Sequence, residues 1–125
     1  MKKTKMLKKN YEFKNVLTKG KYYTGRNVEA FIINNKFNYN FLGLAISVKV
    51  GKATKRNMIK RLIRENYKNI ESSIKNGYSI VFLWKKKADI KNANYYNIQE
   101  DMQKIFKSAK IFLDEENIWK KYLLG

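Results

Sequence analysis

The stretch of residues 52–68, KATKRNMIKRLIRENYK, combines a dense run of basic residues with regularly spaced apolar ones. Its apolar positions Ile59, Leu62, Ile63 and Tyr67, together with Ile70 just beyond it, share one arc of a helix at about 100° per residue, the pattern of an amphipathic helix packed on a core. We expect this helix to be capped by Thr54 and to run to about Ile74, before the turn signal Asn76-Gly77.

The basic residues occupy the remaining surface of the same helix. The set comprises Arg56, Asn57, Lys60, Arg61, Arg64 and Lys68, with Lys49 and Lys52 just ahead of the helix. Only Glu65 interrupts the run, whereas an ordinary surface helix mixes acids among its bases. The pattern favours a phosphate-binding face over the alternative of a merely solvated one.

The charge of the whole chain is large and uneven. The net charge is +18 over 125 residues; residues 1–64 hold 17 Lys/Arg and two acids, net +15, and residues 65–125 hold 11 and eight, net +3. Such a field is typical of proteins that meet a polyanion. A lysine-rich composition explains part of the excess, but three of the four arginines lie within nine residues, where guanidinium geometry suits phosphate.

Composition also limits the function. Cysteine and histidine are absent, which removes disulfides, thiolate metal sites and imidazole bases. The acid pairs Glu100-Asp101 and Asp114-Glu115 fit helix ends better than a two-metal centre, so we expect no catalytic residue and no metal site in the protein. No secretory signal and no apolar run of roughly 18 residues is present, and we expect a cytoplasmic soluble protein.

The chain reads as one RNA-binding domain, residues 1–125, with a core of about 7–112 and a C-terminal extension, 113–125. We expect a short helix from Asn10 to Gly20, strands at 22–24, 28–33, 41–48 and 78–84, the basic helix, and a second long helix from Asn94. Acids at 114–116 suit the start of a short last helix. The order α-β-β-β-α-β-α predicts an α+β fold, a two-layer α/β sandwich with helices packed on a mixed sheet.

The expected strand at 41–48 has two unlike faces. Leu42, Leu44, Ile46 and Val48 alternate onto the face that we assign to the core. The opposite face carries Phe41, Gly43, Ala45 and Ser47, small enough to leave space. Either the first helix packs there, or Phe13 and Phe31 wall a shallow groove for single-stranded bases.

Structured RNA is the polyanion that the pattern suits best. A strand precedes the basic helix, so a DNA-reading helix-turn-helix does not fit. The aromatic signature of an RNA-recognition motif and the GXXG loop of a KH domain are missing. Recognition of RNA by shape and backbone remains.

One family combines these features. Its motif runs roughly Ser-x-Lys-x-Gly-x-Ala, Arg-Asn-Arg-x-Lys-Arg and then Arg-Glu, and the matching residues here are Ser47, Lys49, Gly51, Ala53, Arg56, Asn57, Lys60, Arg61, Arg64 and Glu65. With LKKNYEF at 7–13, the chain resembles the protein subunit of bacterial ribonuclease P over about Leu7 to Phe112. It departs at Met58, where arginine is usual, at Val48, often lysine, and at Leu17, where a second aromatic is frequent.

The resemblance implies an accessory subunit of an endoribonuclease whose catalyst is RNA. The RNA would hold Mg²⁺ and remove the 5′ leader of precursor tRNA, and the protein alone would bind no cofactor, membrane or small-molecule substrate. The catalytic RNA would be bound by the basic set: Lys49, Lys52, Arg56, Asn57, Lys60, Arg61, Arg64 and Lys68. A leader groove would be lined by Phe13, Leu17, Phe31, Ser47 and Lys49. The family's left-handed βαβ crossover is expected against the general right-handed rule.

Two other interpretations remain open. The chain could be a general structured-RNA-binding or ribosome-associated basic protein without a cleavage role. It could also be a polycationic surface protein that binds any anion or membrane, for which lysine would serve as well as arginine.

Overall fold

The computed structural model describes residues 3–113. Its strands are β1 (Thr4–Met6), β2 (Lys21–Thr24), β3 (Val28–Asn34), β4 (Asn40–Leu44) and β5 (Tyr78–Trp84). Its helices are α1 (Asn10–Lys19), α2 (Ala53–Ile70) and α3 (Tyr95–Ser108), with 3₁₀ turns η1 (Val48–Val50), η2 (Glu71–Ser73) and η3 (Ile90–Asn92). The helix expected from residue 114 lies outside the described residues.

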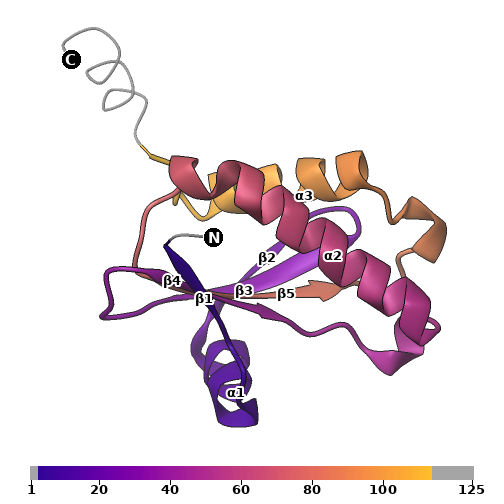
Figure 1. Cartoon of the computed structure of the whole chain (residues 1–125), viewed down its shortest axis with the longest axis horizontal. Coiled ribbons are helices and arrows are strands. Elements are labelled where there is room, and N and C mark those ends of the chain that lie inside the picture. The colour runs from indigo at the N-terminus through magenta and orange to yellow at the C-terminus, as the bar shows by residue number, and fades with distance from the viewer. Residues whose placement is uncertain (1–2, 114–125) are drawn as a thin grey trace, which may run out of the picture.

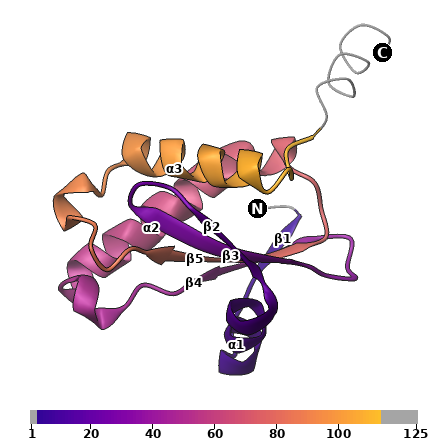
Figure 2. The ribbon, with the colours of Figure 1, turned by 180° about the vertical axis from the view of Figure 1, so that it is seen from behind.

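The five strands form one mixed sheet in the order β1-β4-β5-β3-β2. β4 pairs in parallel with β1 and β5, whereas β3 pairs antiparallel with β5 and β2. α2 connects the parallel neighbours β4 and β5, and the path traced in Figures 1 and 2 is a left-handed crossover. The predicted α+β fold with a mixed sheet is confirmed, and the crossover follows the family rather than the general rule.

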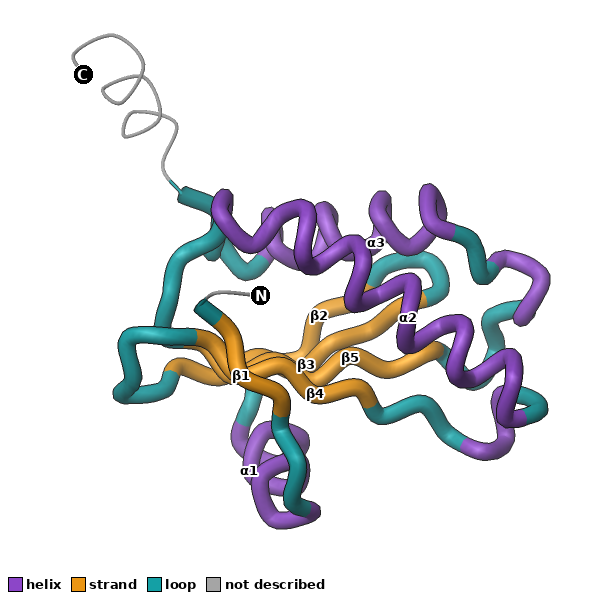
Figure 3. The backbone as a smooth tube through the Cα atoms, viewed as in Figure 1, coloured by secondary structure: helices purple, strands orange, loops and turns teal. Residues whose placement is uncertain are grey.

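Helices lie on both faces of the sheet (Figures 1 and 3). α2 and α3 cover one face, and the main core lies between them and the sheet, with Ile59, Phe82 and Phe106 fully buried. α1 packs on the other face over a smaller apolar cluster centred on Val16 and Val81. The chain therefore presents two separate surfaces, the outer side of α2 and the side of the sheet that carries α1.

The strand expected at 41–48 ends early, at Leu44. Leu44 pairs with Phe82, and the chain then turns into η1, where the Ser47 hydroxyl accepts a hydrogen bond from the Lys49 N–H at 3.2 Å. Leu42 and Ile46 are buried as predicted, but Val48 is 73% exposed and its assignment to the core face is wrong. Alternation stops predicting a face once the chain leaves the sheet.

The start of α2 also differs from the prediction. The helix begins at Ala53 with Lys52 as its N-cap residue, so Thr54 lies inside the first turn and caps nothing. Its end is close to the prediction, since the 3₁₀ turn η2 (Glu71–Ser73) follows directly after Ile70.

β1 is a strand that the periodicity did not indicate. It is three residues long and is held by a buried polar network. The hydroxyls of Thr4 and Tyr67 share a hydrogen bond of 2.6 Å, and the Asn40 amide donates to the Tyr67 oxygen at 3.3 Å. Burial raises the pKa of Tyr67, so the phenol keeps its proton and joins β1, β4 and α2.

Candidate nucleic-acid interface

The predicted RNA-binding residues lie on one continuous side of α2 and on the turn before it, which we call the basic face. Exposed side chains are Lys49, Lys52, Asn57, Arg61 and Lys68, and partly buried ones are Arg56, Lys60 and Arg64. The partly buried three repeat at i+4 beside the apolar arc, where their aliphatic stems can cover apolar surface while the charges reach solvent. The helix thus presents a row of cations on a rigid element.

The N-terminal end of α2 carries no competing negative charge. Its first turn contains no acidic residue and its N-cap makes no side-chain hydrogen bond. One guanidinium nitrogen of Arg56 donates to the Gly51 carbonyl at 3.1 Å, which orients this arginine at the turn that carries Lys49 and Lys52. The positive end of the helix dipole therefore adds to the side-chain charges.

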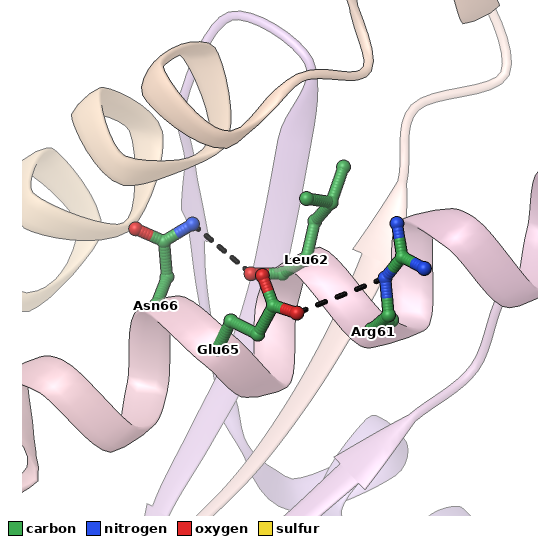
Figure 4. A network of polar contacts seen from close by, with 4 residues as sticks. All are labelled: Arg61, Leu62, Glu65 and Asn66. Carbon is green, nitrogen blue, oxygen red and sulfur yellow. Dashed lines mark hydrogen bonds and ion pairs between the residues drawn. The ribbon is translucent and has the colours of Figure 1, made fainter.

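The one acid of α2 pairs with an arginine of the basic face. Glu65 Oε1 lies 3.7 Å from Arg61 Nε, and both side chains are at least half exposed. Figure 4 shows this pair beside Asn66, whose amide points toward the Leu62 carbonyl. That amide donates to the carbonyls of Leu62, at 3.0 Å, and Tyr95, at 3.2 Å, and so ties α2 to α3.

Replacing Glu65 with glutamine is expected to strengthen RNA binding about two- to fivefold, because it frees Arg61 and removes the one negative charge of the helix. The free energy of unfolding should change by less than about 1 kcal/mol, since exposed pairs stabilise weakly and an acid C-terminal to its base is the poorer order. Titration with a structured RNA measures the affinity. Glu100→Gln, an exposed acid on α3, is the control, and an equal gain there would contradict a local effect.

Met58, which replaces the usual motif arginine, is partly buried and lies outside the basic row. It shares an i+4 row with Leu62 and Asn66, the row that faces α3. By helical geometry it lies on the opposite flank from Lys60. The departure from the motif therefore leaves the row of Arg56, Lys60 and Arg64 uninterrupted.

The predicted groove residues fall into two groups. Phe13, Leu17 and Phe31 belong to the apolar cluster under α1. Phe13 packs so closely that a Cβ on Gly43 would lie 2.6 Å from its ring, so α1 fills part of the space left by the small residues. Ser47 and Lys49 are exposed beyond the end of β4 and are not members of that cluster.

Asp101 is a residue whose role the sequence did not reveal. It is buried within α3 rather than at a helix end. Its carboxylate accepts hydrogen bonds from the backbone N–H groups of Arg26 at 2.9 Å, Asn27 at 2.8 Å and Val28 at 3.0 Å. It thereby holds the β2–β3 turn, which carries the exposed Arg26, against α3.

Other kinds of site receive no support between residues 3 and 113. That part of the chain contains no group of three or more metal-ligating side chains. It also contains no helix that is both long and apolar enough to cross a membrane.

Comparison with known proteins yields one family. A family model described as Ribonuclease P matches residues 1–110. The ribonuclease P protein component of Clostridium botulinum (strain Loch Maree / Type A3) is 38% identical over 111 residues, which cover 88% of this chain and 98% of the relative. That of Fusobacterium nucleatum is 40% identical over 107 residues, covering 84% and 96%.

Solved structures agree with this result. The Staphylococcus aureus RNase P protein superimposes with a TM-score of 0.76 at 33% identity, covering 86% of this chain and 97% of that one. The Thermotoga maritima RNase P protein gives a TM-score of 0.75 at 25% identity, covering 83% and 96%.

Proposed function

This chain belongs to the ribonuclease P protein family, and we propose that its basic face docks on the catalytic RNA of that enzyme while the α1 side of its sheet holds the 5′ leader of precursor tRNA. Members of the family are accessory subunits of an endoribonuclease that binds RNA and matures tRNA 5′ ends. The partner implied by membership is therefore the RNA of ribonuclease P. A general ribosome-associated role is the less economical account of the same charges.

The observation that carries the docking proposal is the acid-free row on α2. Arg56, Lys60 and Arg64 are spaced by one helical turn, and no acid precedes Glu65 in the helix. One guanidinium group can donate two hydrogen bonds to the oxygens of one phosphate. The row therefore suits the ordered phosphates of a folded RNA better than an anionic surface without fixed geometry. We assign Mg²⁺ to RNA phosphates, which supply the oxygen ligands that this cation prefers.

The leader groove is proposed along α1. Phe13, Leu17 and Phe31 are partly exposed apolar side chains on the same face of the sheet, and bases stack on such surfaces with little sequence preference. Ser47 and Lys49 follow β4 and lead directly to α2, so a strand leaving the groove would reach the basic face at Lys49. We place the protein, and with it the cleavage of precursor tRNA, in the cytoplasm.

Phe31→Ala tests the groove. In a holoenzyme reconstituted from this chain, the catalytic RNA and precursor tRNA at low Mg²⁺, the wild-type protein should stimulate 5′ cleavage. The variant should lose at least about fivefold in affinity for substrates with a leader, because one stacking surface is gone. Affinity for a mature-length 5′ end should stay unchanged.

The control for Phe31→Ala is Ile33→Ala, on the same strand and face, which removes apolar area without removing a ring. Equal effects of the two variants would point to loss of packing under α1. A wild-type protein that gives no stimulation would contradict the proposed function as a whole.

A further inference from the structure

We propose a second site for single-stranded RNA on the far flank of α1, formed by Tyr11, Phe37, Tyr39 and Phe41, which we call the aromatic flank. Its occupant is the upstream part of the same leader that the proposed groove holds, and the inference therefore rests on the proposed function. Two of its rings, Phe37 and Tyr39, lie in the turn region of residues 34–40, and neither the proposed groove nor the basic face uses any of the four.

Three of the four rings of the aromatic flank, those of Phe37, Tyr39 and Phe41, form one contiguous surface. Phe37 and Tyr39 stack with ring centroids 5.6 Å apart at 25°, and Phe41 lies 5.4 Å from each of them. Phe37 is 54% exposed and Tyr11 67% exposed, among the largest exposures of apolar or aromatic side chains in residues 3–113. A ring that served only to stabilise the core would be covered by protein.

The loop that carries Phe37 is held in place rather than free. The Asn35 side chain accepts a hydrogen bond from the Phe37 N–H at 2.9 Å and donates to the Ser79 hydroxyl at 3.2 Å. The Asn35 N–H donates to the Gly77 carbonyl at 2.8 Å. Because Asn35 ties the loop to the start of β5, the ring is presented in advance of binding, which lowers the entropy cost of stacking a base.

A groove runs between Tyr11 on α1 and the other rings of the aromatic flank. It has a volume of about 500 Å³ and is lined by Tyr11 and Asn15 of α1 on one side and by Phe37 and Phe41 on the other. This volume is within the range of sites that hold a nucleotide-sized ligand. The groove therefore offers room for at least one base next to the rings.

The charges around the groove suit a phosphate backbone. Lys5 Nζ lies 4.5 Å from the centre of the Tyr39 ring, and Lys9 Nζ lies 5.8 Å from that of Tyr11. Glu12 is the one acid among the lining residues, and its carboxylate already accepts the backbone N–H groups of Lys9, at 2.9 Å, and Lys8, at 3.3 Å. Rings flanked by lysines are the combination that binds single strands without sequence preference.

The position of the site selects the leader rather than the catalytic RNA as occupant. Figures 1 and 2 show α1 on the side of the sheet opposite to α2, so an RNA docked on the basic face is screened from this groove by the sheet. Phe13 and Leu17 lie on one flank of α1, and Tyr11 and Asn15 lie on the other, by the helical repeat. A strand that follows the α1 side would reach the aromatic flank after the first groove.

The experiment compares substrates with leaders of about 5 and about 15 nucleotides, lengths that bracket a single-strand binding site. In the reconstituted holoenzyme the wild-type protein should bind the long leader more tightly than the short one. Phe37→Ala should lower the affinity for the long leader by about fivefold or more, so that this gain disappears, and should leave the affinity for the short leader unchanged. Phe37→Trp should retain the gain, and Phe37→Leu, which keeps apolar bulk without a ring, should not.

The control is Tyr96→Ala, a ring 75% exposed on α3, which should leave the gain intact. A gain that survives Phe37→Ala overturns the proposal, and so does a wild-type protein without any gain. Weaker binding of Phe37→Ala to the catalytic RNA alone would assign the ring to that RNA and would also overturn it. If the wild-type protein does not stimulate 5′ cleavage of the substrate with the short leader, by contrast, that result would count against the proposed function itself.

Discussion

Replacing Asp101 with alanine is expected to lower the free energy of unfolding by about 3–5 kcal/mol, the largest effect of any single substitution considered for this chain. The carboxylate accepts three backbone hydrogen bonds, from Arg26, Asn27 and Val28, at a site that is 4% exposed. Alanine would leave these donors without their acceptor in a place that water reaches poorly, and a small domain has only about 5–15 kcal/mol of stability.

The carboxylate is also fitted to its position by shape. A Cβ on Gly25 would lie 2.6 Å from the Asp101 Cβ, so the turn and α3 are in close contact. Asp101→Asn should therefore destabilise less than alanine, because it keeps the volume and one acceptor oxygen. Urea unfolding midpoints that rise from Asp101→Ala through Asp101→Asn to the wild type would support this role of the carboxylate.

Glu100→Ala is the matched control, because Glu100 is the preceding residue of α3 and is exposed. It should change the free energy of unfolding by no more than about 0.5 kcal/mol. Similar losses from Glu100→Ala and Asp101→Ala would show that helix charge, rather than the three backbone hydrogen bonds, is responsible.

Replacing Arg56, Arg61 and Arg64 together with lysine is expected to weaken binding to the catalytic RNA by at least about tenfold at constant salt. The net charge does not change, but each lysine offers a point charge where a guanidinium can pair two N–H groups with one phosphate. Arg56 also loses its hydrogen bond to the Gly51 carbonyl, which orients the turn before α2.

The salt dependence of binding distinguishes geometry from charge. The slope of log affinity against log salt should be the same for the wild type and the triple variant, because the number of cations is unchanged, whereas the affinity itself should fall. Arg26→Lys, at the one arginine outside α2, is the control and should leave the affinity unchanged. Unaltered affinity of the triple variant would favour an undifferentiated polycationic surface.

Much of the architecture was predictable, because it follows from local periodicity. α1, α3 and most of α2 lie where the apolar spacing placed them, and Gly20 and Asn94 act as the expected end and cap. The basic face was equally predictable, since residues three and four apart on a helix share a side whatever the rest of the fold does. The departure in α2, its first residue, concerns a helix end.

Contacts between distant segments were not predictable. β1 has three residues and no alternation, and it is held by pairing with β4 and by the hydrogen bond between Thr4 and Tyr67, 63 positions apart. Val48 follows the alternation of β4 but lies past the end of the sheet. Asp101 looks like any surface acid until α3 is placed beside the turn at Gly25.

The sequence by itself determined most of the elements, the basic side of α2 and the family, because each of these depends on residue type and spacing within a short stretch. Only the tertiary structure decided that α1 lies opposite α2 and that its two flanks carry different side chains. It also decided that Asp101 and Asn35 each hold a turn. The physical reason is that burial and hydrogen-bond partners are set by which faces meet, and a linear pattern specifies a face without naming what it will pack against.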